Sequence, residues 1–178
     1  MATTRFLGQV GGFTNVIFGT LSGASSGVLA AAGNYDANDI WSNSATNGAG
    51  VAWLFSDAAK DIGGTGVIVG VTATLSVDNI TPRLRLWVFN ANPSASELDD
   101  NAALSIAAAD RTKLMGYVDL PGLADAGAIS YSQVFNLVQP FKCASTSRDL
   151  YGIVQTLDAV TGEAADMTLT VALHVLQD

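Results

Sequence analysis

Charged side chains are scarce in this chain of 178 residues. They make up 13% of it, against about 25% in typical globular domains, while apolar residues make up 49%. A chain with so few charges has little to cover its surface with, so part of that surface is expected to be buried against other subunits. The eight basic residues are scattered and the net charge is −8, which argues against a nucleic-acid partner.

Cysteine is nearly absent, and no familiar catalytic motif is present. The single cysteine, Cys143, excludes an internal disulfide and is expected to be a small, partly buried hydrophobe. The only histidine, His174, lies in a regular strand pattern and has no second histidine with which to share a metal. There is no G-x-S-x-G, P-loop or dinucleotide fingerprint. Carboxylates distant in the sequence could still form a glycosidase pair, but nothing points to one, so we expect no enzyme, cofactor or metal.

Charge is also missing from the whole stretch of residues 6–35. Gly, Ser, Asn and Thr interrupt its apolar residues, which argues against a membrane-spanning helix and against a signal peptide. Arg5 and the alanines at 30–32 are the features that a signal peptide would share. We expect residues 1–34 to form an extended assembly arm that lies across the sheet or on a neighbouring subunit. Its candidate interface residues are Phe6, Phe13, Ile17, Phe18 and Leu21.

The rest of the chain has the patterns of β-strands. Strands are expected at residues 51–56, 66–77, 84–89, 115–120, 132–138, 150–157 and 168–176. Gly, Pro and Asp turns separate them. The strands at 66–77 and 84–89 are expected to pair antiparallel, and the strand at 132–138 to end before Pro140. These patterns predict an all-β fold, a single antiparallel β-sandwich of jelly-roll type over residues 35–178.

Alternation also predicts which side chains face the core. In the strand at 66–77, Val67, Val69, Val71, Ala73, Leu75 and Val77 fall on one face. In the last strand, Leu169, Val171, Leu173 and Val175 are expected inward, and Thr168, Thr170, Ala172 and His174 outward. A one-residue slip of this strand would turn its whole apolar set away from the core.

Two groups of residues allow both a structural and a binding interpretation. Glu97, Asp99, Asp100 and Asn101 could bind a hard cation such as calcium, but turns and helix caps use the same residues, and we favour that second reading. Residues 102–109 could be a short helix capped by Asp99 or Asp100, or an irregular strand. The tryptophans Trp41, Trp53 and Trp87 could stack on sugars, although packing in a core or interface is the commoner use.

Residues 84–120 carry a resemblance to a known family. Their sequence, LRLWVFNANPSASELDDNAALSIAAADRTKLMGYVDL, resembles that of tailed-phage capsid decoration (cement) proteins, in which a pattern LxLxxF…NPxxS…DNxxxxI…D…KLxGxVxL lies within a small β-domain. Weaker similarity extends in matching order over most of residues 35–178. The arm before Tyr35 is not covered by it.

The resemblance implies a structural virion protein without chemistry of its own. Such a protein would lie on the outer surface of the capsid as a dimer or trimer, bind the major capsid protein and itself, and reinforce the shell. No catalytic residue follows from the family pattern. The alternative is a virion fibre or host-surface protein that binds carbohydrate through its tryptophans and loops.

Overall fold

Nearly all the regular structure of the described residues consists of β-strands. The computed structural model describes residues 13–21, 27–30, 33–161 and 167–177. The strands are β1 (Phe13–Phe18), β2 (Gly27–Val28), β3 (Ile40–Trp41), β4 (Trp53–Phe55), β5 (Thr65–Leu75), β6 (Leu84–Phe89), β7 (Leu114–Leu120), β8 (Ala124–Asp125), β9 (Ser130–Lys142), β10 (Leu150–Thr156) and β11 (Thr168–Gln177). A single 3-10 turn, η1 (Ala108–Asp110), is the only helical element of the described residues.

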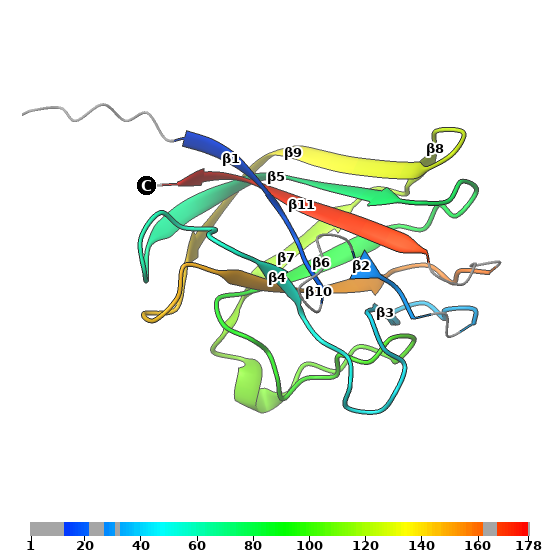
Figure 1. Cartoon of the computed structure of the whole chain (residues 1–178), viewed down its shortest axis with the longest axis horizontal. Helices are drawn as coiled ribbons and strands as arrows, with labels where there is room; N and C mark the ends of the chain where they lie inside the picture. The colour runs from blue at the N-terminus through cyan, green and yellow to red at the C-terminus, as the bar shows by residue number, and fades with distance from the viewer. Residues whose placement is uncertain (1–12, 22–26, 31–32, 162–166, 178) are drawn as a thin grey trace, which may run out of the picture.

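The strands form two antiparallel sheets that lie face to face. Sheet A has the order β1-β11-β5-β9-β8, with β2 also pairing with β11. Sheet B has the order β3-β10-β6-β7, with β4 pairing with β10. In Figure 1, β9, β5 and β11 form one layer, and β7, β6 and β10 the other. The predicted all-β antiparallel sandwich is therefore confirmed. No helix of the described residues is long and apolar enough to cross a membrane.

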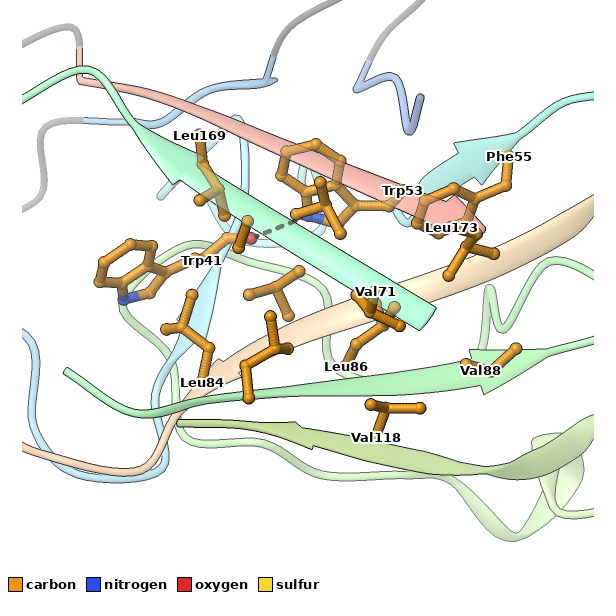
Figure 2. Packing of buried hydrophobic residues seen from close by; sticks show 14 of the residues in the cluster. Trp41, Trp53, Phe55, Val71, Leu84, Leu86, Val88, Val118, Leu169 and Leu173 are labelled. Atoms are coloured by element: carbon orange, nitrogen blue, oxygen red, sulfur yellow. Dashed lines mark hydrogen bonds between the residues drawn. The ribbon is translucent and has the colours of Figure 1, made fainter. Parts of the chain in front are cut away.

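The core fills the space between the two sheets. Val71, Leu169 and Leu173 of sheet A and Leu86 and Val88 of sheet B are almost completely buried and belong to one cluster. Figure 2 shows these side chains between the strands. The inward residues predicted for the last strand are confirmed, because Leu169, Val171, Leu173 and Val175 are all buried in this cluster.

Two of the three tryptophans are core residues. Trp41 is fully buried and Trp53 is 1% exposed, so neither can stack on a sugar at the surface. The indole N–H of Trp53 donates a hydrogen bond to the backbone oxygen of Trp41 over 3.3 Å, the dashed line in Figure 2. Burial of a tryptophan in a strand is favoured when its N–H finds such an acceptor.

The predicted facing of β5 is wrong over its first half. Ile68 is fully buried, whereas Val67 and Val69 are only partly buried. The register against β9 shifts between Ile68 and Gly70, which marks a bulge. An extra residue in one strand reverses the alternation on one side of it. Val71, Ala73 and Leu75, beyond the bulge, are inward as predicted.

Two further predictions about strands are wrong. The strands β5 and β6 are successive in the sequence but do not pair, because β5 lies between β11 and β9 in sheet A, whereas β6 lies between β10 and β7 in sheet B. The segment between them crosses from one sheet to the other. In addition, β9 does not end before Pro140 but continues to Lys142, with Pro140 paired opposite Val67 beyond the irregularity.

Part of the segment predicted to be an arm is built into the sandwich. The strand β1 lies at the edge of sheet A and pairs with β11 from Phe13 to Phe18. Leu21 and Leu29, which flank the undescribed residues 22–26, are buried in the core. Removal of residues 1–34 would therefore remove an edge strand and core side chains as well as any assembly contact. Residues 1–12 lie outside the described part of the chain.

Candidate interaction surface

The outward surface of sheet A is formed by side chains from four strands in register. One row runs across β1, β11, β5 and β9 through Val16, His174, Gly70 and Phe135. We call this surface the open face. Its residues are Thr14, Val16, Phe18, Val67, Gly70, Thr72, Thr74, Tyr131, Gln133, Phe135, Val138, Pro140, Thr170, Ala172, His174 and Leu176.

Several large apolar side chains of the open face are exposed to solvent. Val138 is 84% exposed, Phe18 56%, Val16 49% and Phe135 42%. These are four of the eight large exposed hydrophobic residues of the described chain, and they gather on one sheet surface. Exposed apolar residues that gather in this way mark interaction sites, whereas single ones are ordinary.

Phe135, on β9, packs against the neighbouring strands of the open face. Its ring lies directly over Gly70, where a Cβ atom would collide with it. It also meets His174 edge-on, with ring centroids 4.8 Å apart. The Nε2 atom of His174 is buried there and has no hydrogen-bond partner among the described residues. Glycine at position 70 thus leaves the space that the Phe135 ring occupies.

Charge is almost absent from the strands of this surface. The sequences of β1, β5, β9 and β11 contain one charged residue, Lys142, at the last position of β9. The chain as a whole carries sixteen acidic and eight basic residues. The acidic groups therefore lie on other parts of the molecule.

The outward surface of sheet B is different, because the chain itself covers much of it. Ile40, Phe89 and Ile153 form a second small apolar cluster there, against which Leu98 and Ile106 pack. The covering segment, residues 90–113, lies on the side of sheet B away from sheet A in Figure 1. Among the described residues, one sheet of the sandwich is thus covered by a segment of its own chain, whereas the other has no such cover.

Buried carboxylates hold this covering segment in place. Asp99 accepts hydrogen bonds from the backbone N–H groups of Gly48 (2.7 Å) and Gly50 (2.8 Å). Burial raises the pKa of Asp99, but the N–H groups of Gly50, Gly48 and Ala49 outweigh it, so the pKa is lowered overall. Asp100 accepts hydrogen bonds from the Tyr35 hydroxyl and the Ser42 backbone N–H, each over 2.7 Å.

Asp110 stabilises the covering segment, residues 90–113, through contacts within the segment itself. It is completely buried and accepts hydrogen bonds from the Ala95 N–H and the Ser96 hydroxyl, with the Lys113 ammonium 2.7 Å away. Burial raises the pKa of Asp110, while Lys113, Ser96 and Ala95 lower it below the usual value.

Of the two structural readings of Asp99, Asp100 and Asn101, the turn is found, at Asp100 and Asn101. The helix cap is not found, because the carboxylates of Asp99 and Asp100 bind the backbone and side chains of distant loops. Residues 102–109 are neither a helix with such a cap nor a regular strand. They contain a single bridge, from Asp39 to Ala103, and lead into the 3-10 turn at Ala108–Asp110, which has no side-chain cap.

A polar and aromatic group occupies the uncovered end of sheet B. The guanidinium of Arg85 lies 4.1 Å from the ring centroid of Tyr117 and pairs with Asp119 through two contacts of 2.5 and 2.9 Å. The rings of Trp87 and Tyr117 lie 5.1 Å apart, and the Trp87 indole N–H donates to Gln155 over 2.9 Å. Tyr117 is half exposed. We call Arg85, Trp87, Tyr117 and Asp119 the aromatic patch.

The residues expected to form the arm interface have different positions. Ile17 and Leu21 are buried in the core of the same chain, and Phe18 is exposed on the open face. Phe13 begins β1, and Phe6 lies outside the described residues. The sequence reasoning missed Val16, Phe135 and Val138. The signal that could have found them is the lack of charge along strands predicted to alternate between core and solvent.

The described residues offer little for catalysis or metal binding. No group of three or more His, Cys, Asp or Glu side chains within them could hold a metal ion. Cys143 is buried, and burial, helped by the nearby Asp149 carboxylate, raises the pKa of its thiol to about 11. The thiolate, which is the reactive form, is therefore scarce at neutral pH.

In comparisons with known proteins, no protein-family model matches the chain and no curated protein gives a significant match to it.

Proposed function

We propose that the chain is a structural virion protein that decorates and stabilises a phage capsid. In this proposal it lies on the outer surface of the shell and binds both the major capsid protein and other copies of itself. It acts without catalysis, cofactor or nucleic acid. The sandwich would have the jelly-roll connectivity expected from the strand pattern.

The open face is the observation that carries this proposal. A single chain exposes a sheet surface with four large apolar side chains and almost no charge, although its net charge is −8. A surface of this kind is best explained by burial in an assembly. The resemblance of residues 84–120 to capsid decoration proteins supplies the kind of assembly. In the structure these residues form β6, β7 and the segment that closes sheet B.

The stabilising effect would come from many small contacts. Burial of apolar surface contributes about 25 cal/mol per Å², and one weak contact gains strength when the same chain is bound at several points at once. Capsid symmetry repeats each contact across the shell. A modest interface per copy would thus raise the stability of the whole shell.

A capsid-binding measurement tests the proposal. The protein is mixed with expanded, empty capsids made of the major capsid protein that the same genome encodes. Bound copies are counted after sedimentation. We expect saturable binding and a higher temperature of capsid disruption. The chain without residues 1–12, which keeps every described strand, should bind less if the sequence prediction of an assembly arm is right. No binding of the full chain to these capsids would refute the proposal.

The aromatic patch supports a second candidate function, carbohydrate binding on the same virion or in a fibre. Trp87 and Tyr117 are the aromatic pair at the surface of sheet B, with Arg85 and Asp119 beside them as hydrogen-bonding groups. A glycan array compares the wild type with Trp87→Ala. Specific binding that this substitution abolishes would favour the second function. Capsid-dependent binding without any glycan signal would favour decoration.

A further inference from the structure

We infer that the open face binds the open face of a second copy, so that two chains form a dimer in which two A sheets lie against each other. This inference rests on the proposed assembly function and deepens it. It names the surface used for self-association, and it assigns the capsid contact to other parts of the chain.

Charge is the first reason for choosing a second copy as the partner. Two chains of net charge −8 repel each other wherever their acidic surfaces meet. Their strands β1, β5, β9 and β11 contain only Lys142 as a charged residue. Contact through the open face brings uncharged surfaces together and leaves the acidic groups in solvent, where salt screens them over about 8 Å at physiological ionic strength.

The polar groups of the open face fit the same partner. Most of them are hydroxyls, those of Thr14, Thr72, Thr74, Thr170 and Tyr131. A hydroxyl both donates and accepts a hydrogen bond, so it can pair with an identical group on another copy. A carboxylate or an ammonium cannot do so. The face is therefore complementary to itself in its hydrogen bonding as well as in its charge.

The shape of the surface favours two copies rather than three. A sheet face that meets an identical face around a two-fold axis closes the assembly, since the same patch is used up on both chains. Sheets pack in this way about 10 Å apart in β-sandwiches. A trimer would need two different surfaces on each chain.

The size of the open face is sufficient for a weak dimer. The ten residues of β11 give the open face a length of about 33 Å, and its four adjacent strands, β11 included, give a width of about 19 Å. The area is therefore roughly 600 Å² per copy. The total of about 1,200 Å² lies at the lower end of specific interfaces. Because association also costs rigid-body entropy, we expect a dissociation constant on the order of 10 µM.

Sedimentation velocity over a concentration series tests the inference with the full-length chain. The wild type should change from monomer to dimer as concentration rises through the micromolar range. Raising the salt concentration should leave the dimer intact or strengthen it, because screening reduces the repulsion between the two acidic chains. An interface held by ion pairs would weaken instead.

Single aspartate substitutions locate the contact. Phe18→Asp and Val138→Asp place a charge on the open face, in β1 and β9, at side chains that are already exposed. Each should weaken dimerisation at least tenfold. Ile62→Asp is the matched control, because Ile62 is 67% exposed in a turn outside the open face, and it should dimerise like the wild type. Circular dichroism and melting curves check that all three variants are folded.

The remaining outcomes separate this inference from the proposed function. A wild type that stays monomeric above about 200 µM, well beyond the expected range for an interface of this size, would overturn the inference, as would dimerisation unaffected by both open-face variants. If the free protein is monomeric and Phe18→Asp abolishes capsid binding, the open face belongs to the capsid contact, and only the inference fails. If the open face mediates dimers but no capsid binds, the proposed function fails and the inference stands.

Discussion

Substitution of Leu173 by alanine should strongly destabilise the fold. Leu173 is fully buried in β11, opposite Ile17 of β1 and Val71 of β5. Replacement by alanine removes three buried carbon groups, worth about 0.8 kcal/mol each. The cavity left behind adds to this loss, so that buried leucines typically cost about 2–5 kcal/mol. We expect about 3 kcal/mol here, because two flanking strands and the facing sheet limit any collapse of the site.

Urea denaturation followed by tryptophan fluorescence measures this loss. With a slope of about 2 kcal/mol per molar urea, the midpoint of unfolding should fall by about 1.5 M. His174→Ala is the matched control on the same strand but the opposite face, and it removes one edge contact with Phe135, worth about 0.5–1.5 kcal/mol. If His174→Ala destabilised the protein more than Leu173→Ala, the assignment of the two faces of β11 would be refuted.

Three further predictions concern the loops and the charges. Gly50→Ala should lower the melting temperature by several degrees, because its Cβ atom would collide with the backbone carbonyl of Leu98; an unchanged melting curve would contradict this close approach. Treatment with EDTA should leave the melting temperature unchanged, and a drop that calcium restores would reveal a metal site. Hydrogen bonds from Arg83 lower the pKa of Asp158 to about 2, so this pair stabilises the fold above about pH 4 and the effect is lost as the pH falls towards 2. Arg83→Gln should therefore raise the pH at which acid unfolds the protein, by only a small amount because the pair is exposed to solvent; an unchanged acid transition would contradict the coupling.

The strands with regular alternation were predictable from the sequence, and the positions of the bulges were not. Leu169 to Val175 alternate cleanly, and the predicted inward set of β11 is buried. The bulge next to Gly70 depends on pairing with β9, more than sixty residues away, and nothing local in the sequence marks it. The pairing of β5 with β6 was wrongly predicted because neighbouring strands in a sandwich can belong to different sheets.

The sequence of the segment that covers sheet B shows turn-forming residues, but it does not show how the segment is folded or where it lies. Asp99 and Asp100 have the composition of a turn, yet their partners are Gly48, Gly50, Tyr35 and Ser42, which are about fifty or more residues distant. Such long-range bonds between a carboxylate and a backbone N–H leave no local periodicity. The open face could be predicted only in part. The shortage of charge was visible, but the gathering of its residues on one surface depends on the order of strands in sheet A.

Electron microscopy of intact particles tests the central proposal most directly. Two kinds of particle are reconstructed: those produced by the phage genome that encodes this chain, and those produced by the same genome after deletion of its gene. We predict density on the outer surface of the shell that fits the sandwich, disappears in the deletion particles and leaves the underlying capsid lattice unchanged. Identical outer surfaces in the two reconstructions would contradict the proposed decoration, as would density for the sandwich confined to the tail or to fibres.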